Sequence, residues 1–379
     1  MKFTEVIGQD ETIAHLIQLK DEGRIPHAIL LCGPEGCGKM AVAMSFASYL
    51  LCEDKTSGED SCDGCLSCRM IKKWAHPDLY FSYPVIRPAG TNPEHKMTSD
   101  DFSSEWREML LSEGAYFSMN TWLKAMHAEN QQAEIGVGES EIIIHNVNIK
   151  PSRGGYKIYI VWLPERMNTQ CANKLLKEIE EPPAGTIYIM VCERPELLLE
   201  TIRSRTQRIN MKQISDDMME KALIERRGID AETARRLARI SSGNWLKATE
   251  MLDAGNENRL FLDMFIMLMR LSYMRNIKDL KKWSETAAGY GREKQKRMLT
   301  YFLKMIRESF MYNFRNPELC YMTSEEEAFA KNFARFINEN NVIEISELLS
   351  TSLNDIAQNA NGKIVFFDMA LKMIVLLIQ

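Results

Sequence analysis

A glycine-rich loop with a lysine lies early in the chain, within the stretch LLCGPEGCGKM at residues 30–40. Its spacing, G-x-x-x-x-G-K, is that of a phosphate-binding loop, in which glycines let backbone N–H groups point at phosphate oxygens. The following helix and the lysine both add positive charge. The motif normally ends in Ser or Thr, whose hydroxyl binds Mg²⁺, but this position is Met40, and a thioether is a poor ligand for a hard cation. The candidate nucleotide-binding residues are Gly33, Pro34, Gly36, Gly38, Lys39 and Met40.

A second candidate site is a set of four cysteines directly after the loop helix: Cys52, Cys62, Cys65 and Cys68. Four thiolates make a closed tetrahedral zinc site, and the two-residue spacing of the last three lets a short loop wrap around the ion. With no open position for water, the zinc ion would be structural. Four buried structural thiols are the alternative, but a polar loop that contains Gly64 offers no core to bury them. A zinc module that reads bases is disfavoured because residues 52–68 are acidic.

The acidic residues that complete a P-loop ATPase are missing from their expected place. A nearly continuous apolar run at Lys157–Leu163 predicts a central strand of a parallel sheet. In P-loop ATPases this strand ends in an Asp that supports Mg²⁺ and a Glu that polarises the attacking water. Here it ends in Trp162 and Leu163, and Glu165 follows too late to substitute. Together with Met40, this ending predicts a loop that can hold phosphate but lacks the metal and water-activating groups for hydrolysis.

The bulk composition is that of a globular protein with two or three domains. The 379 residues are 45% apolar and 26% charged, and the formal charge of −5 disfavours non-specific binding to duplex DNA. The N-terminal MKFTEVIGQD has no signal peptide, and nine cysteines without an export signal predict thiols or metal ligands rather than disulfides. The apolar run Ile364–Gln379 is interrupted by Asp368 and Lys372, so it predicts a packed helix rather than a membrane span. We therefore expect a cytoplasmic protein that does not bind a membrane.

Three domains follow from the order of the predicted elements. Residues 1–212 combine strands with helices, residues 213–254 form a small helical domain, and residues 255–379 form an all-helical domain with Met-rich apolar core faces. The predicted elements of the first domain are the strands Ala28–Cys32, Asp78–Ser82, Lys157–Leu163, Thr186–Cys192 and one within Thr201–Asn210, and the helices Asp10–Glu22, Lys39–Leu51 and Asn168–Glu180. The later helices, interrupted at Gly255, are Asp216–Arg226, Ala231–Ile240, Trp245–Leu252, Arg259–Met274, Gln295–Phe314, Ala328–Glu339, Val342–Ala357 and Val365–Ile378.

An insert at about 86–150 is less regular, because prolines and a glycine near its start interrupt it. Its two predicted helices, Asp100–Ser112 and Phe117–Ala128, form a hairpin that covers the sheet, and a partner-docking surface is the alternative. Residues 133–153 are ambiguous between helix and strand.

The order of these features resembles the AAA+ subunits of the bacterial DNA polymerase III clamp loader. The matching segments are VIGQ at 6–9, RIPHAILLCGPEGCGK at 24–39, the four cysteines, GGYKIYIV at 154–161, NKLLKEIEEPP at 173–183, and TIRSRT at 201–206, where the family has Ser-Arg-Cys. These segments cover residues 1–210 densely, and the helical remainder fits the family's lid and collar in outline. The resemblance implies an α/β P-loop (AAA+) domain with a parallel sheet, a small helical lid domain and an all-α collar domain through which subunits associate.

Within that family the chain is most similar to delta prime, the subunit that does not hydrolyse ATP. The motor subunits keep Ser or Thr after the loop lysine, Asp-Glu at the end of the late strand, and a nucleotide-sensing arginine in a Gly-x-x-Arg setting of the lid. This chain has Met40, then Trp162 and Leu163, and, after Gly243, Leu246. The resemblance therefore implies no intrinsic activity, although a DNA-directed DNA polymerase label attaches to the holoenzyme, and only weak binding of ATP or ADP.

One catalytic residue is retained under this resemblance. The family's Ser-Arg-Cys arginine reaches into the ATP site of the neighbouring subunit, where it stabilises the charge on the γ-phosphate, and Arg205 matches it. Pairing of Arg205 with a carboxylate of its own chain is the alternative. The implied partners are motor subunits of the gamma/tau type, a delta-like subunit, the sliding clamp, and primed DNA bound through the complex. An active motor ATPase of the same family and a zinc-dependent nucleic-acid-binding module are the alternative functions.

Overall fold

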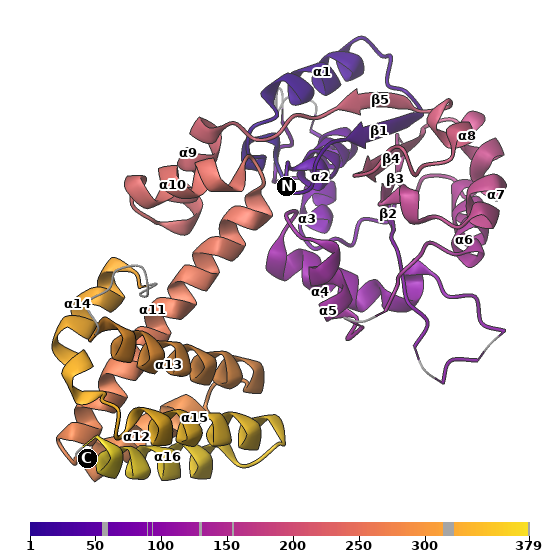
Figure 1. The fold of residues 1–379 in the computed structure, drawn as a ribbon. Helices are drawn as coiled ribbons and strands as arrows, with labels where there is room; N and C mark the ends of the chain where they lie inside the picture. The colour runs from indigo at the N-terminus through magenta and orange to yellow at the C-terminus, as the bar shows by residue number, and fades with distance from the viewer. Residues whose placement is uncertain are drawn as a thin grey trace. The chain divides into compact units, whose positions relative to one another are not determined.

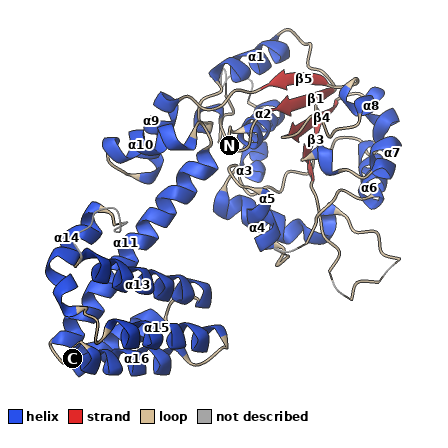
Figure 2. Ribbon diagram, in the orientation of Figure 1, coloured by secondary structure: helices blue, strands red, loops and turns tan. Residues whose placement is uncertain are grey.

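The centre of the first half of the chain is a sheet of five parallel strands, seen in the computed structural model (Figures 1 and 2). The strands are β1 (Ala28–Cys32), β2 (Leu79–Ser82), β3 (Lys157–Trp162), β4 (Thr186–Cys192) and β5 (Gln207–Asn210). They pair in the order β2-β3-β4-β1-β5, and every pairing is parallel. Strands β1, β3 and β4 are buried at every position, as expected for central strands that are covered on both faces. The predicted parallel α/β sheet is therefore confirmed.

The structure describes residues 1–54, 60–88, 90–92, 94–128, 131–153, 155–313 and 322–377. The predictions for the other positions lie outside the described residues: residues 55–59 of the cysteine loop, residues 89, 93 and 129–130 of the insert, Gly154, Phe314, and residues 378–379. The chain forms two compact units, Met1–Met251 and Leu252–Gln379. A further division of the first unit at residues 212 and 213 stays a prediction.

Helices cover both faces of the sheet (Figure 2). The helices of the first unit are α1 (Asp10–Asp21), α2 (Lys39–Leu51), α3 (Leu66–Ile71), α4 (Ser103–Glu113), α5 (Met119–Ala125), α6 (Val137–Val147), α7 (Thr169–Glu180), α8 (Glu200–Arg203), α9 (Asp216–Arg227) and α10 (Ala231–Ser241), with 3-10 turns at Phe3–Glu5, Ser99–Phe102 and Pro164–Arg166. Ile29 of β1 packs in one hydrophobic cluster with α1, α2, α4 and α5, whereas Leu30 packs in another with α6 and α7. This division follows from the alternation of side chains along a strand.

The insert is a helical hairpin that covers the sheet, as predicted. Trp106 of α4 and Trp122 of α5 have ring centroids 5.0 Å apart, and Trp162 at the end of β3 lies 5.5 Å from Trp106. Trp122 is fully buried, and its Nε1 donates a hydrogen bond to the carbonyl of Pro84 at 2.7 Å. Helix α6 accounts for most of the stretch that was ambiguous in the sequence.

Trp122→Ala is expected to lower the free energy of unfolding of the first unit by about 3–5 kcal/mol, the usual cost of truncating a buried aromatic side chain. The change also leaves the buried carbonyl of Pro84 without its donor. Urea denaturation followed by circular dichroism measures the loss. Leu111→Ala is the control, because Leu111 is 57% exposed on the same hairpin. A loss no larger than that of the control would contradict the packing role.

Helix α11 (Trp245–Tyr273) is one continuous helix of 29 residues (Figure 1). The prediction of two helices separated at Gly255 is therefore wrong. A glycine inside a helix costs about 1 kcal/mol relative to alanine. Buried apolar side chains on both sides of it, Leu252 and Phe261, favour continuation of the helix by packing.

The second unit is all-helical, as predicted. After the end of α11 its helices are α12 (Ile277–Ala288), α13 (Arg292–Tyr312), α14 (Ser324–Phe333), a 3-10 turn Ala334–Phe336, α15 (Val342–Ala357) and α16 (Gly362–Leu376). The prediction omitted α12, although Leu280, Trp283 and Ala287 have the apolar spacing of a helix and are buried. Helix α14 begins before the predicted Ala328 because Thr323 caps it and accepts from the N–H of Glu326. Among the described residues, no helix has both the length and the apolar run that crossing a membrane requires.

Candidate functional site

The phosphate loop joins the carboxyl end of β1 to the amino end of α2. Gly36 and Gly38 have φ angles of +71° and +94°, in the left-handed region that strains residues with a side chain. Helix α2 begins at Lys39, with Gly38 as its N-cap residue. The structure therefore places the predicted loop residues at the positive end of a helix dipole.

Lys39, the lysine of the loop, is engaged by groups of its own chain. Its Nζ donates a hydrogen bond to the carbonyl oxygen of Pro34 at 2.6 Å and lies 3.8 Å from Oε1 of Glu193. Only 4% of the Lys39 side chain is exposed. Burial raises the pKa of the Glu193 carboxyl, and the charge of Lys39 opposes this rise. The cation that a phosphate would use is thus paired inside the chain.

Glu193 was not predicted from the sequence, and its position follows from the register of the sheet. Cys192 pairs with Cys32, so the residue after β4 lies beside the start of the phosphate loop. Glu165, the late carboxylate after β3, accepts hydrogen bonds at Oε1 from the N–H groups of Glu193 and Arg194 at 2.9 and 3.0 Å. Glu165 therefore holds the turn that carries Glu193. The signal for Glu193 in the sequence was its place directly after a predicted buried strand.

The two positions that lack the usual metal ligands are packed into the core. Met40 is 5% exposed and Trp162 is 3% exposed, and both side chains belong to the same hydrophobic cluster. Neither side chain offers an oxygen ligand for Mg²⁺.

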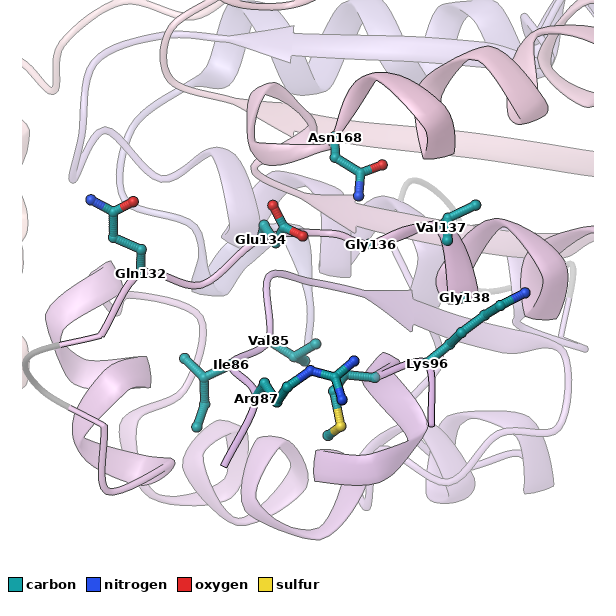
Figure 3. A pocket seen from close by; sticks show the side chains of 11 residues that line it. Val85, Ile86, Arg87, Lys96, Gln132, Glu134, Gly136, Val137, Gly138 and Asn168 are labelled. Atoms are coloured by element: carbon teal, nitrogen blue, oxygen red, sulfur yellow. The ribbon is translucent and has the colours of Figure 1, made fainter. Parts of the chain in front are cut away.

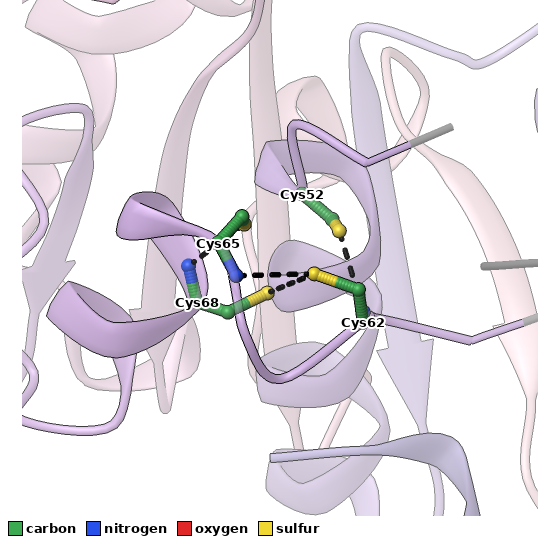
Figure 4. Close-up of side chains that lie close together, drawn as sticks. All are labelled: Cys52, Cys62, Cys65 and Cys68. Carbon is green, nitrogen blue, oxygen red and sulfur yellow. Dashed lines mark hydrogen bonds between the residues drawn. The ribbon is translucent and has the colours of Figure 1, made fainter. Parts of the chain in front are cut away.

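The four predicted cysteines lie together (Figure 4). Their sulfur atoms all lie within 4.8 Å of one another, and the Sγ atoms of Cys62 and Cys68 are 3.9 Å apart. A tetrahedral zinc ion with Zn–S bonds of about 2.3 Å would place its sulfurs about 3.8 Å apart. The donor set and its spacing therefore fit a four-coordinate metal site.

Backbone N–H groups already point at three of these sulfurs. The N–H of Cys62 donates to Sγ of Cys52 at 3.4 Å, that of Cys65 to Sγ of Cys62 at 3.3 Å, and that of Cys68 to Sγ of Cys65 at 3.4 Å. The N–H groups of Cys65 and Gly64 lower the pKa of the Cys62 thiol to about 7. Burial raises the pKa of the Cys68 thiol. Such hydrogen bonds orient thiolate ligands around a metal ion.

The cysteine loop is tied to two segments that are distant in the sequence. The carboxylate of Asp60 accepts from the N–H of Phe3 at 3.1 Å. Glu53 accepts from Oγ of Ser67 at 3.0 Å and from Nε of Arg153 at 2.7 Å. A metal ion in the loop would therefore also brace the N-terminal turn and the segment before β3.

Arg205 lies between α8 and β5, on the surface of the first unit. Its Nε donates to Oε2 of Glu180 at 2.9 Å, and a terminal nitrogen donates to the carbonyl of Thr201 at 3.0 Å. The side chains of Arg205 and Glu180 are 33% and 54% exposed. Exposed ion pairs contribute about 0–1 kcal/mol. The local pairing left open by the sequence is therefore present, and it is weak enough to be exchanged for another partner.

A cavity of about 290 Å³ lies between segments of the insert, beside Val85, which follows β2, and Asn168, which precedes α7 (Figure 3). Arg87, on its wall, donates to two backbone carbonyls of the insert. The Lys96 side chain extends past Gly138 toward helix α6, where its Nζ pairs with Glu141 at 2.6 Å (Figure 3). Both cations on the wall, Arg87 and Lys96, are thus bonded to other residues of the insert.

Comparison with known proteins matches the first unit to replication proteins. The family model described as "DNA polymerase III, delta subunit" matches residues 8–215. DNA polymerase III subunit delta' of Bacillus subtilis is 26% identical over 231 residues, which are 61% of this chain and 55% of that protein. Subunit delta' of Yersinia pestis is 29% identical over 205 residues, 54% of this chain and 44% of that protein. DNA polymerase III subunit gamma/tau of Mycobacterium tuberculosis is 30% identical over 204 residues, 54% of this chain and 27% of that protein.

The family-model match lies within the α/β part of the chain. The chain spans about half the length of the delta' relatives that it matches. The family model covers more than half of the chain, including the phosphate loop, the cysteine cluster and Arg205. These matches confirm the resemblance drawn from the sequence motifs. The chain belongs to the family described as DNA polymerase III, delta subunit, and within it is delta-prime-like.

Proposed function

We propose that this chain is a non-motor subunit of the DNA polymerase III clamp loader, which helps to load the sliding clamp on primed DNA in the cytoplasm. The observation that carries the proposal is the pairing of Lys39 with the carbonyl of Pro34 and with Glu193. A motor subunit needs this lysine for the nucleotide phosphates. Here its side chain is 4% exposed and is bonded to groups of its own chain.

The active role of the subunit is to complete the ATP site of a neighbouring subunit. Arg205 is surface-accessible and held by weak contacts, so it can turn toward a γ-phosphate presented by a partner. An arginine supplied in this way stabilises the charge that develops during phosphoryl transfer. The partners would be motor subunits of the gamma/tau type and a delta-like subunit, which associate with this chain through its C-terminal helices, residues 255–379.

The cysteine cluster would hold a structural zinc ion through Cys52, Cys62, Cys65 and Cys68. Four sulfur ligands leave no position for water, so the ion would supply rigidity rather than Lewis-acid chemistry. The hydrogen bonds of Asp60 and Glu53 extend that rigidity to the N-terminal turn and the segment before β3.

An active motor ATPase is the second candidate, because a gamma/tau subunit is 30% identical over the matched region and the loop keeps its glycines and lysine. The two candidates differ in whether the isolated chain turns over ATP.

The purified chain is expected to show no Mg²⁺-dependent ATP hydrolysis above the background of the Lys39→Ala variant. The physical reason is that Met40 and Trp162 supply no metal ligand and Lys39 is paired with Glu193. Phosphate release at saturating ATP, with and without Mg²⁺, measures the rate. Steady turnover by the unmodified chain that Lys39→Ala abolishes would favour the motor instead.

A further inference from the structure

We propose that Tyr116, which the insert carries, locks the lid segment around α11 onto the phosphate loop and keeps nucleotide out of it. The insert hairpin covers the sheet, and Tyr116 lies in the turn between its two helices, α4 and α5. The inference rests on the proposed function, because it concerns how the phosphate loop of a non-motor subunit stays closed.

The two left-handed glycines of the loop are both covered by side chains from distant segments. A Cβ atom at Gly36 would collide with Oδ1 of Asn244, and the N–H of Trp245 donates to the carbonyl of Gly36 at 3.1 Å. A Cβ atom at Gly38 would lie 3.1 Å from Oη of Tyr116. Asn244 and Trp245 lie at the start of α11, so the lid and the insert meet on the phosphate loop.

Tyr116 is held on the loop from two sides. Its hydroxyl accepts a hydrogen bond from the N–H of Ile7 at 2.8 Å. Its ring centroid lies 6.0 Å from that of Trp245, and the guanidinium of Arg226 lies 6.0 and 5.9 Å from these two rings. Arg226 also donates to the carbonyl of Glu5 at 2.5 Å. Burial raises the pKa of Tyr116 to about 12, so the hydroxyl stays neutral at physiological pH.

This arrangement blocks the groups that would bind a polyphosphate. Nucleotide phosphates bind through backbone N–H groups of the loop and through its lysine. Here Asn244 lies against Gly36, Tyr116 lies against Gly38, and Nζ of Lys39 donates to the carbonyl of Pro34 in the same loop. A nucleotide can therefore enter only after the start of α11 and Tyr116 have both moved.

The side chains of the lock have room to move. Tyr116, Arg226 and Trp245 line a cavity of about 730 Å³. Tyr116 and Arg226 each make one hydrogen bond to the backbone, at Ile7 and Glu5. The ring and cation–aromatic contacts among Tyr116, Arg226 and Trp245 are individually weak. A single substitution is therefore enough to open the lock without unfolding the sheet.

Residue-resolved hydrogen–deuterium exchange of the full chain tests the lock. The reporter is the amide of Trp245, because its acceptor is Gly36 rather than Tyr116. Tyr116→Ala is expected to speed exchange at this amide by about tenfold or more, since the closed form loses one of its supports. Arg226→Ala is expected to speed exchange at this amide by a similar factor. The exchange rate in the double variant is expected to be close to that in either single variant, because both residues act in one unit.

The same variants are titrated with a fluorescent ADP analogue. While most molecules are closed, the apparent affinity for the analogue is proportional to the fraction of open molecules. A tenfold rise in that fraction is therefore expected to strengthen the apparent affinity about tenfold. Tyr116→Phe keeps the ring but removes the hydroxyl, so exchange at Ile7 is expected to rise more than exchange at Trp245. Tyr273→Ala is the control, because Tyr273 is 59% exposed in the other unit.

Two results would overturn the lock. The first is an exchange rate at Trp245 in Tyr116→Ala that equals the rate in Tyr273→Ala. The second is an affinity of Tyr116→Ala for the ADP analogue that equals that of the unmodified chain. Neither result bears on the non-motor role itself, which is tested by ATP hydrolysis. Conversely, a variant that binds the analogue but still hydrolyses no ATP supports both the lock and the proposed function.

Discussion

Arg205→Ala is expected to slow ATP hydrolysis at one site of the assembled clamp loader by about 10³-fold or more, the usual value of an arginine supplied in trans. The isolated variant is expected to fold normally. Its lost contacts, with Glu180 and the carbonyl of Thr201, are on the surface and contribute about 0–1 kcal/mol. The two effects therefore separate a catalytic role from a structural one.

The measurement uses the reconstituted complex with motor subunits, clamp and primed DNA. Single-turnover hydrolysis resolves the affected site, because the other ATP sites continue to contribute in the steady state. Arg205→Lys is expected to recover little of the rate, since a lysine lacks the planar fork of the guanidinium. Arg203→Ala is the matched control, because Arg203 lies two residues away, is 40% exposed and contacts Glu200 of its own helix. A rate that Arg205→Ala leaves unchanged in the complex would rule out the trans role.

Removal of metal from the cysteine cluster is expected to loosen the first unit of the chain. Structural zinc sites contribute folding free energy directly, and the isolated loop has no core of its own. For Cys65→Ser we expect a loss of about 4 kcal/mol or more, the range of mutations that remove a metal site. This corresponds to a fall of about 8–16 °C or more in the melting temperature for a unit of this size. No catalytic step should be lost, because the site offers no open coordination position.

Zinc content and stability are measured on the same preparation. Denaturation of the unmodified chain in the presence of a colorimetric chelator should release zinc in a one-to-one ratio with protein. Asp63→Asn is the control, because Asp63 lies in the same loop with φ of +65°, which asparagine also tolerates, and an amide there leaves the four thiols untouched. Protein that releases no zinc, or Cys65→Ser that melts like the control, would remove the zinc proposal.

The features that the sequence predicted well are those with a strong local signal. The strands β1 and β4 and the helix α2 have the predicted bounds, because each is an apolar run bordered by turn residues. The cysteine cluster was also predictable, since its four ligands lie within one short loop. These elements can therefore be predicted without knowledge of the tertiary structure.

The features that were missed depend on contacts between distant residues. Glu193 comes beside Lys39 only because β4 pairs with β1, and Tyr116 reaches Gly38 only because the insert folds back over the sheet. The continuous α11 was missed for a related reason, since tertiary packing outweighs the low helix propensity of Gly255. Local patterns located the phosphate loop, whereas the groups that close it became visible only in the folded chain.

The edge strands of the sheet are short, and this affects the tendency of the protein to aggregate at high concentration. The two outermost strands, β2 and β5, have only four residues each, and three of the four positions in β5 are exposed, among them Arg208. A short, charged edge strand offers few unpaired backbone groups to a second molecule, so it is a poor template for intermolecular β-pairing. The chain should therefore resist fibril growth from its native state.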